Sequence, residues 1–233
     1  MSLPFFYTEN VSVYSIFLSE ETSRHITQVL RKKISDQILL TDGKGTKAIT
    51  EITNDHRKHC EVKIISVEKE NKPLQKVTIA ISLIKNTSRF ELFLEKATEI
   101  GVSEIIPLLC ERTEKEKFRY ERLNGILISA MLQSQQCWLP VLHHPTEFKK
   151  VITTQSDLNF IAHCANGEKN PLTAQQPNRS TSQLILIGPE GDFTEEEIKS
   201  AIDKDFQPVA LGNTRLRTET AGIVAATLLC NPS

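Results

Sequence analysis

The sequence predicts an α/β protein in which a small β-rich unit precedes a mostly parallel sheet covered by helices. In residues 1–70, short alternating strands and a glycine turn accompany a single helical segment. From residue 76 onward, apolar strands alternate with helical segments, which is typical of a parallel sheet with helices on both faces. Residues 69–75 (KENKPLQ) are polar and contain Pro73, which favours a domain boundary. We therefore expect two domains, 1–70 and 76–233.

The amino-terminal unit has the alternation and the turn chemistry of a small barrel. Residues 21–31 are the one expected helix, because Ile26, Val29 and Leu30 recur at helical spacing. Residues 42–45 (DGKG) supply a tight turn between two strands. The expected strands are those around Val11 and Val13, 37–41, 46–53 and 60–67. Together these segments predict a small β-barrel that carries one helix.

The second domain is expected to alternate strand and helix throughout. Gly101 follows an apolar-faced helix at 90–100, in the position where a left-handed residue ends a helix. The other expected helices are 120–134 and 146–153, and the expected strands are 77–83, 105–109, a short one after Pro140, 158–162 and 184–187. Residues 166–182 are rich in Asn, Gln, Ser, Thr and Pro, which predicts a long polar loop.

Composition bounds the class of protein. The chain has 233 residues, of which 39% are hydrophobic and 24% charged, as in ordinary globular proteins. No apolar run approaches the roughly 18 residues of a membrane span, and no signal-peptide pattern opens the chain, so we expect a cytoplasmic protein. Its 5 cysteines are scattered and include no C-x-x-C pair, which favours reduced thiols. The net charge of -1 gives no overall indication of nucleic-acid binding.

Residues 188–193 (GPEGDF) form the first of two unusual strand-to-helix junctions. They follow the apolar strand 184–187. Thr194 then opens a helix, and Glu197 three residues later predicts a capping box. In open α/β sheets, loops at the carboxyl ends of parallel strands are where ligands bind.

Residues 211–229 (LGNTRLRTETAGIVAATLL) form the second junction, after a strand that ends near residue 211. Gly212 and Asn213 are the residue types that best tolerate positive φ in a tight turn. Thr218 is expected to cap the next helix with its side chain. From Ala221 that helix is apolar nearly all round and should be buried.

Several common kinds of site are excluded. The chain has no G-x-G-x-x-G and no G-x-x-x-x-G-K-[ST], so it lacks the phosphate cradles of dinucleotide and P-loop proteins. No His, Cys, Asp or Glu spacing suggests a metal site. His163 and Cys164 are neighbours on a predicted strand end and would point to opposite faces, which argues against a catalytic dyad.

Residues 186–191 (LIGPEG) followed by residues 211–221 (LGNTRLRTETA) resemble the signature of the RsmE family. These are bacterial 16S ribosomal RNA (uracil-N3) methyltransferases of the SPOUT superfamily. The resemblance covers nearly the whole chain. The further matching blocks are 25–31, 42–45, Lys85, 95–102 and 106–112.

The resemblance implies a PUA-like β-barrel at 1–70 that binds RNA, and a SPOUT α/β domain with a trefoil knot within about 158–230. It implies S-adenosyl-L-methionine as cofactor, no metal, and homodimers. The implied reaction is methylation of N3 of a specific uridine in 16S ribosomal RNA, with an assembled small ribosomal subunit as the expected substrate. Near-neutral charge fits a structured substrate better than free RNA.

The resemblance also assigns roles to individual residues. Arg217 would stabilise the uracil anion, and Glu219 is a weaker candidate for proton acceptor, for which the role of a helix-start carboxylate is favoured. The implied cofactor-binding residues are Ile187, Gly188, Pro189, Glu190, Gly191, Leu211, Gly212, Leu216, Arg217 and Thr220. The implied RNA-binding residues are Arg24, His25, Arg31, Lys85, Arg89 and Arg112.

Two positions depart from the family pattern. Asp192 stands where members often have a second glycine, and residues 135–138 (QQCW) lack an arginine that members often have there. A carboxylate at Asp192 is favourable near a helix start and could sense the positive sulfonium of the cofactor.

Two other functions are compatible with these motifs. One is another SPOUT methyltransferase, acting on a ribose 2′-hydroxyl or on transfer RNA. The other is a non-catalytic RNA-binding assembly factor that keeps the fold without the activity. The intact segments 188–191 and 217–220 favour an enzyme.

Overall fold

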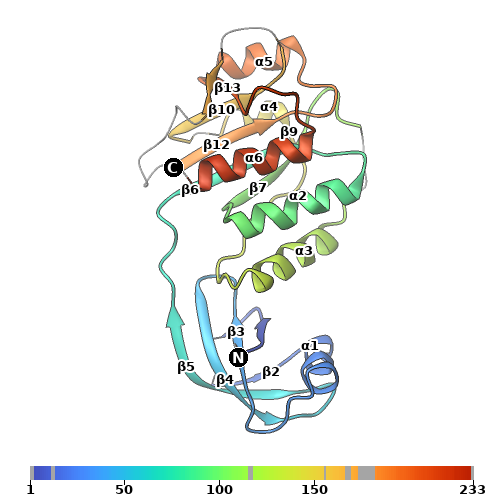
Figure 1. Ribbon diagram of the computed structural model, residues 1–233, viewed down its shortest axis with the longest axis vertical. Helices are drawn as coiled ribbons and strands as arrows, with labels where there is room; N and C mark the ends of the chain where they lie inside the picture. The colour runs from blue at the N-terminus through green and yellow to red at the C-terminus, as the bar shows by residue number, and fades with distance from the viewer. Residues whose placement is uncertain are drawn as a thin grey trace. The chain divides into compact units, whose positions relative to one another are not determined.

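The computed structural model describes residues 3–11, 14–114, 118–154, 156–165, 169–172 and 182–231. The chain forms two compact units (Figure 1). One comprises Met1–Lys72 and Met131–Leu139, and the other comprises Pro73–Ala130 and Pro140–Ser233. Val13 and most of the predicted polar loop, 166–168 and 173–181, lie outside the described residues.

The amino-terminal unit is built on a five-stranded sheet. Its strand order is β1 (Phe5–Tyr7), β3 (Gln37–Thr41), β4 (Thr46–Asn54), β5 (Glu61–Lys69) and β2 (Ser15–Phe17). β1 is parallel to β3, and the other pairs are antiparallel. Its core includes Ile16, Ile26, Ile38, Leu40, Ile52 and Val62. The predicted strands 37–41 and 46–53 are therefore confirmed, whereas closure into a barrel stays a prediction.

The predicted helix at 21–31 is shorter and changes its hydrogen bonding. α1 (Glu20–Arg24) begins after Ser19, whose side chain accepts a hydrogen bond from the Thr22 N–H, and a π-helical turn (His25–Val29) follows. Ile26 is buried, but Val29 is 68% exposed and Leu30 is also exposed. The helical spacing of Ile26, Val29 and Leu30 therefore does not give one buried face, because a π turn takes more residues than an α turn and rotates the later side chains away.

The turn at residues 42–45 packs against the segment Met131–Leu139. Gly45 has φ 85°, and a Cβ there would lie 2.3 Å from the Trp138 ring, so only glycine fits. The Gly45 N–H donates to the Cys137 carbonyl at 2.8 Å, and the Leu139 N–H donates to the Gly43 carbonyl at 2.8 Å. These contacts place Met131–Leu139 in the amino-terminal unit, which the predicted boundaries did not anticipate.

The second unit contains one extended sheet whose described pairings are all parallel, as predicted. The strand order is β11 (Asn170–Pro171), β13 (Gln207–Ala210), β10 (Leu158–Ala162), β12 (Ser182–Ile187), β6 (Lys76–Ser82), β7 (Glu104–Leu109) and β8 (Val141–Leu142), and β9 (Thr146–Glu147) also pairs with β7. The segment predicted to be a polar loop contains β11. This strand pairs with β13 and so extends the sheet by one strand.

Helices cover both faces of this sheet (Figure 1). α2 (Thr87–Ile100) and α6 (Thr218–Cys230) lie side by side on one face, where α6 packs on β6 and β12. α4 (Phe148–Val151) and α5 (Glu195–Ile202) bury the other face, in a core with Ala80, Leu184 and Leu186. Successive strand residues therefore point to opposite helical layers, as a sheet buried on both faces requires.

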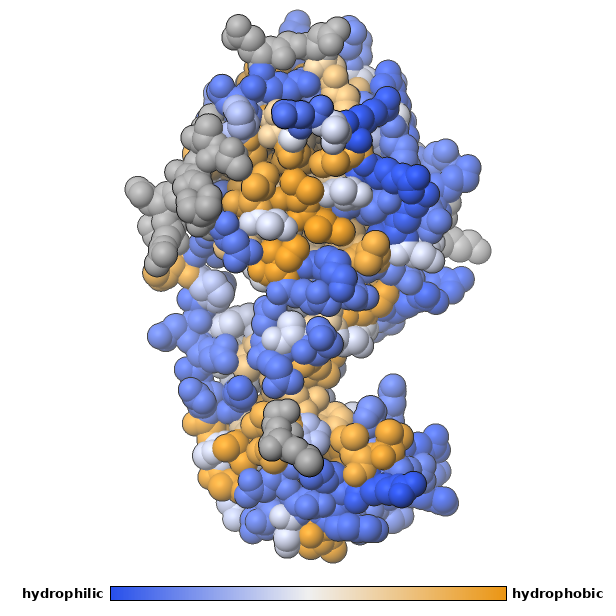
Figure 2. Space-filling view, viewed as in Figure 1, coloured by the Kyte–Doolittle hydropathy of each residue, from blue (hydrophilic) through white to orange (hydrophobic). Residues whose placement is uncertain are grey.

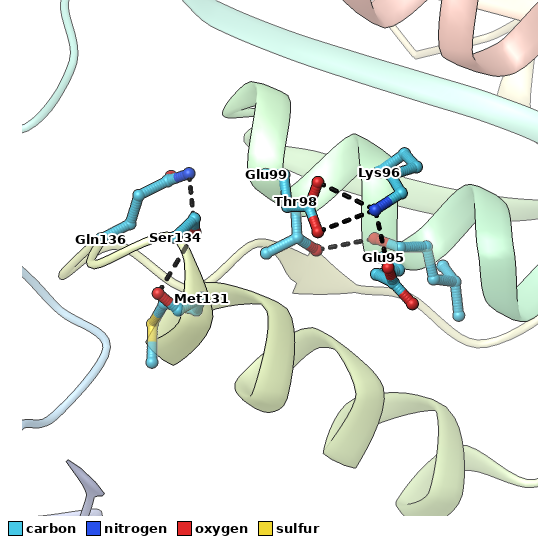
Figure 3. Close-up of polar contacts among 8 residues, drawn as sticks. Glu95, Lys96, Thr98, Glu99, Met131, Ser134 and Gln136 are labelled. Atoms are coloured by element: carbon cyan, nitrogen blue, oxygen red, sulfur yellow. Dashed lines mark hydrogen bonds and ion pairs between the residues drawn. The ribbon is translucent and has the colours of Figure 1, made fainter. Parts of the chain in front are cut away.

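The ends of α2 and α3 (Tyr120–Gln133) follow local rules. Gly101 ends α2 with φ 100°, and its N–H donates to the Ala97 and Thr98 carbonyls, as predicted. On α2, Lys96 lies within hydrogen-bonding distance of Glu95 (2.7 Å) and Glu99 (3.0 Å) (Figure 3). After α3, Gln135 adopts φ 60°.

The residues after α3 include the place where the family often has arginine. There the Gln136 side chain donates to Ser134 Oγ at 3.1 Å, and Ser134 Oγ donates to the Met131 carbonyl at 3.2 Å (Figure 3). The Ser134 side chain thus bonds a carbonyl group in the last turn of α3, and the Gln136 side chain bonds Ser134.

α6 is less completely buried than its composition predicts. Gly222, Ala225, Ala226 and Leu229 are buried, but Ala221, Ile223, Val224 and Leu228 are only half-buried. Figure 2 shows an apolar surface over this helix. None of the helices in the described ranges combines the length and the apolar character of a membrane span.

Gly222 lies where α6 packs tightly against Phe93 of α2 and Ile81 of β6. Replacing Gly222 by alanine is expected to destabilise the protein by about 1–3 kcal/mol, because the new methyl would overpack. Its Cβ would lie 2.7 Å from the Phe93 ring and 2.8 Å from Ile81. Urea unfolding measures the change.

Gly125 on α3 is the matched control. In the described part of the chain, nothing outside its own helix lies within 4 Å of an added Cβ. Gly125→Ala is therefore expected to stabilise the protein by about 0.5–1 kcal/mol. Effects of the same sign at both glycines would contradict the packing of α6.

Candidate functional site

A cavity of about 350 Å³ lies at the carboxyl edge of the parallel sheet. β10 lies between β13 and β12, so the loops that follow these three strands meet there. Its lining includes Ile187, Gly188, Pro189, Glu190, Leu216 and Arg217 from the predicted set, together with Ala162, Cys164, Asp192, Arg215, Thr218 and Ala221. Gly191, Leu211, Gly212, Thr220 and Glu219 are not among the described residues that line it.

The 188–193 loop is a tight turn with an unusual backbone conformation at Asp192. Asp192 has φ 62°, a left-handed conformation that costs a non-glycine residue about 1 kcal/mol. Its carboxylate offsets this cost by accepting hydrogen bonds from the Cys164 N–H at 2.7 Å and the Phe193 N–H at 2.9 Å. The glycine that the family pattern often has at position 192 would suit this left-handed conformation. Asp192 adds a hydrogen bond to Cys164, in the segment that follows β10.

The helix after this loop begins as predicted. Thr194 and Glu197 form a capping box, in which the Thr194 N–H donates to Glu197 Oε2 at 2.9 Å and the Glu197 N–H donates to Thr194 Oγ1 at 3.2 Å. The second Glu197 oxygen, Oε1, accepts from the Glu111 N–H at 2.9 Å. Glu197 therefore joins the start of α5 to the segment after β7.

Thr218 does not cap α6, so that prediction was wrong. The N-cap residue is Arg217, without a side-chain cap, and Thr218 is the first helical residue. Its buried hydroxyl instead donates to the Gly188 carbonyl at 3.1 Å. Arg215 Nη2 lies 3.4 Å from the Glu190 carbonyl oxygen. The 211–221 segment therefore contacts the 188–193 loop through two side chains, which bond carbonyl oxygens 30 and 25 residues earlier in the chain.

Arg217 and Glu219 occupy different environments. Arg217 is exposed at the cavity, and its guanidinium makes no hydrogen bond or ion pair within the described residues. Glu219 is only 6% exposed, in the first turn of α6. One of its oxygens lies 3.7 Å from Arg89 Nε, and Oε2 has no hydrogen-bond partner among the described residues.

The basic residues predicted to bind RNA are distributed over both units. In the amino-terminal unit, Arg24 pairs with Glu20, the His25 ring packs edge-on against Phe6, and Arg31 is exposed with φ 54°. In the second unit, Lys85 pairs with Glu114 at 2.9 Å, and Arg89 faces Glu219. Arg112 donates to the Gly191 carbonyl at 2.7 Å. Within the described ranges, each of these residues except Arg31 thus already contacts another residue of the protein.

Two of the lining residues that the sequence did not single out come from the end of β10 and the segment just after it. Ala162 and Cys164 line the cavity because β10 lies next to β12, and strand order cannot be read from local patterns. His163, between them, has both ring nitrogens buried without a partner among the described residues. Burial and the nearby Lys169 ammonium lower the pKa of His163. Within the described ranges no cluster of His, Cys, Asp and Glu could hold a metal ion.

Thr218→Val is expected to destabilise the protein by about 1 kcal/mol. Valine keeps the shape but leaves the Gly188 carbonyl without its donor. Thr218→Ser keeps the hydroxyl and is the control. Chemical unfolding measures both variants, and equal stability of the valine and serine variants would show that the hydrogen bond contributes nothing.

His163 is expected to make stability fall as the pH drops below about 6.5. The lowered pKa keeps the folded-state imidazole neutral, whereas the unfolded chain gains a proton near its ordinary pKa, so acid favours unfolding. His163→Gln should reduce this loss by less than about 1 kcal/mol, because the side chain is only half-buried. The free energy of unfolding of both proteins is measured at pH 7.5 and at pH 5.5, on either side of the ordinary histidine pKa of about 6.5. An unchanged pH dependence in the variant would exclude His163 as its source.

Comparison with known proteins identifies the family of both units. Residues 70–230 match the family described as RNA methyltransferase domain, and residues 18–65 match the RNA methyltransferase PUA domain. The chain is 31% identical over 223 residues to a ribosomal RNA small subunit methyltransferase E of Synechocystis, covering 93% of this chain and 73% of the relative. A relative of the same name in Bacillus subtilis is 28% identical, with 93% and 89% covered.

Two solved structures share the fold over nearly the whole chain. A "probable rRNA-methyltransferase" of Porphyromonas gingivalis has a TM-score of 0.90 and 38% identity, with 96% of this chain and 95% of that chain covered. A ribosomal RNA small subunit methyltransferase E of Neisseria gonorrhoeae, bound to S-adenosyl methionine, has a TM-score of 0.86 and 27% identity, with 97% and 95% covered. By sequence and by fold, this chain belongs to the RNA methyltransferase family that the motifs at 186–191 and 211–221 indicated.

Proposed function

We propose that this protein transfers the methyl group of S-adenosyl-L-methionine to N3 of a specific uridine in 16S ribosomal RNA. The observation that carries this proposal is the cavity at the ends of β10, β12 and β13, lined by both halves of the family signature. Relatives named ribosomal RNA small subunit methyltransferase E support the class of substrate.

The residues around the cavity fit a cofactor held largely by backbone groups. A Cβ at Gly188 would lie 3.1 Å from the Phe193 ring, so the backbone there packs tightly against Phe193. Ile187, Gly188, Glu190 and Leu216 would hold the cofactor, and Gly191, Leu211, Gly212 and Thr220 belong to the same two loops. When bound, S-adenosyl-L-methionine supplies an electrophilic methyl group on a positive sulfonium.

Arg217 is the side chain that we assign to the target base. Methyl transfer is an in-line displacement, so alignment of the uracil nitrogen lowers much of the barrier. The N3 proton must leave, and the guanidinium at the cavity, without a partner among the described residues, would stabilise the resulting anion. Glu219 is the weaker candidate for proton acceptor, because its carboxylate faces Arg89 and is not part of the described lining.

We propose that the amino-terminal unit, as a PUA-like barrel over 1–70, binds the RNA. The proposed contacts are Arg24, His25 and Arg31 in that unit and Lys85 and Arg89 in the second. With a net charge of -1, affinity for free RNA should be modest. An assembled small ribosomal subunit, which offers a preformed surface, is therefore the proposed substrate, and the cytoplasm the proposed location.

The course of the chain supports a trefoil knot within about 158–230. β13 lies outside β10, yet α6 returns to pack on β12 and β6 beside α2. The half-buried apolar face of α6 supports a homodimer, because a second copy would remove Ile223, Val224 and Leu228 from water.

A strain that lacks this protein is expected to lose 3-methyluridine from its small-subunit ribosomal RNA. Mass spectrometry of the purified RNA detects the modification, and expression of the wild-type chain should restore it. Loss of a ribose 2′-O-methyl group or of a transfer RNA modification instead would identify a different substrate. Calorimetry without measurable affinity for S-adenosyl-L-methionine would indicate a non-catalytic factor.

Arg217→Ala is expected to lower kcat by about 100-fold or more, since removal of one anion-stabilising donor typically has this effect. The fold should be retained, because Arg217 is exposed. Arg217→Lys, which keeps the charge, should retain part of the activity. Methyl transfer to small subunits from the deletion strain provides the assay, and full activity of the alanine variant would remove Arg217 from the mechanism.

A further inference from the structure

Arg112 lies just after β7 and reaches the 188–193 loop. Its Nη1 donates to the Gly191 carbonyl at 2.7 Å and lies 3.4 Å from the Phe193 carbonyl oxygen. The aliphatic stem runs along Gly191, where an added Cβ would lie 3.4 Å from Arg112 Cδ. One guanidinium nitrogen and the stem of the side chain thus contact the same loop, although the side chain as a whole is exposed.

The two peptide groups that Arg112 contacts are fixed at their other ends as well. The N–H of Asp192, in the peptide of the Gly191 carbonyl, donates to the Pro189 carbonyl at 2.9 Å. The N–H of Thr194, in the peptide of the Phe193 carbonyl, donates to Glu197 Oε2 at 2.9 Å. Each peptide plane is therefore bonded on both sides, and the Arg112 guanidinium is one of the two groups that fix its orientation.

Glu197 closes these bonds into a ring. Its Oε1 accepts from the Glu111 N–H at 2.9 Å, and Glu111 immediately precedes Arg112. The segment after β7 therefore holds the 188–193 loop and the start of α5 through a side chain and through its own backbone. Glu197 is buried, so its bonds are shielded from competing water.

We infer that Arg112 is a positioning residue for the cofactor-binding loop and not a contact for RNA phosphate. The inference rests on the proposed function, since it concerns the binding of S-adenosyl-L-methionine. An exposed arginine beside the site of an RNA enzyme suggests a phosphate contact, but here Nη1 of the guanidinium donates to two carbonyl oxygens of the 188–193 loop. A cofactor held by backbone groups depends directly on the orientation of those peptides.

Arg112→Met tests the inference, because methionine keeps much of the stem and removes the donors. Calorimetry should show a Kd for S-adenosyl-L-methionine raised about tenfold, the effect of one lost hydrogen bond to a charged group. The KM for small ribosomal subunits from the deletion strain should stay within about twofold of wild type. Without any ligand, hydrogen exchange of the amides at 188–194 should be faster.

Lys199→Met is the charge control. Lys199 is exposed on α5 and lies outside the cavity lining, so its substitution removes one positive charge and should leave both constants unchanged. Arg112→Lys keeps the charge that a phosphate contact needs but not the guanidinium geometry, and it should still weaken cofactor binding several-fold. It also replaces the methionine variant if that protein fails to fold.

Two results would overturn the inference. One is an unchanged cofactor Kd in both Arg112 variants. The other is a rise in the KM for small subunits at least as large as the rise in cofactor Kd, which would make Arg112 an RNA contact. Failure of the wild-type protein to bind S-adenosyl-L-methionine would refute the proposed function instead, and hydrogen exchange in the 188–194 segment would still report whether Arg112 holds the loop.

Discussion

The site depends on how the carbonyl oxygens of the 188–193 loop are held. Thr218 bonds the Gly188 carbonyl, Arg215 approaches that of Glu190, and Arg112 bonds that of Gly191. A hydrogen bond of this kind contributes about 1 kcal/mol net, and a folded domain is stable by only about 5–15 kcal/mol. The contacts therefore represent an appreciable share of stability concentrated in one turn. These hydrogen bonds fix the backbone of the 188–193 loop, and a fixed backbone suits a ligand that is recognised by main-chain groups.

The order of strands makes these contacts possible. β12 lies between β10 and β6, and β7 lies next to β6, so the loops after β12 and β7 emerge at one edge of the sheet. α6 contributes twice, since Thr218 at its start bonds the loop while Gly222 lets the helix lie against Phe93 and Ile81. Core packing and site geometry are thus coupled through one helix. A side chain added at Gly222 would displace the helix start as well as the core.

Local patterns predicted the parts of the fold that depend on neighbouring residues. The alternation of apolar strands and helices predicted the parallel sheet, because burial on both faces demands continuous apolar strands. The Thr194 and Glu197 capping box and the left-handed Gly101 were also predicted, since each bond spans only a few residues. Residues of both paired segments, 186–191 and 211–221, line the cavity, although Gly191, Leu211 and Gly212 are not among its described lining residues.

The sequence alone therefore determined the class of fold, the family, and the two loops of the site. Only the tertiary structure decided that Thr218 bonds Gly188 instead of capping its own helix, that Arg112 bonds Gly191, and that Met131–Leu139 joins the amino-terminal unit. The physical reason is the same in each case. A polar side chain bonds to whichever acceptor the chain topology brings within about 3 Å. That topology is set by the burial of whole strands and helices, and the residues next to the side chain in sequence do not determine it.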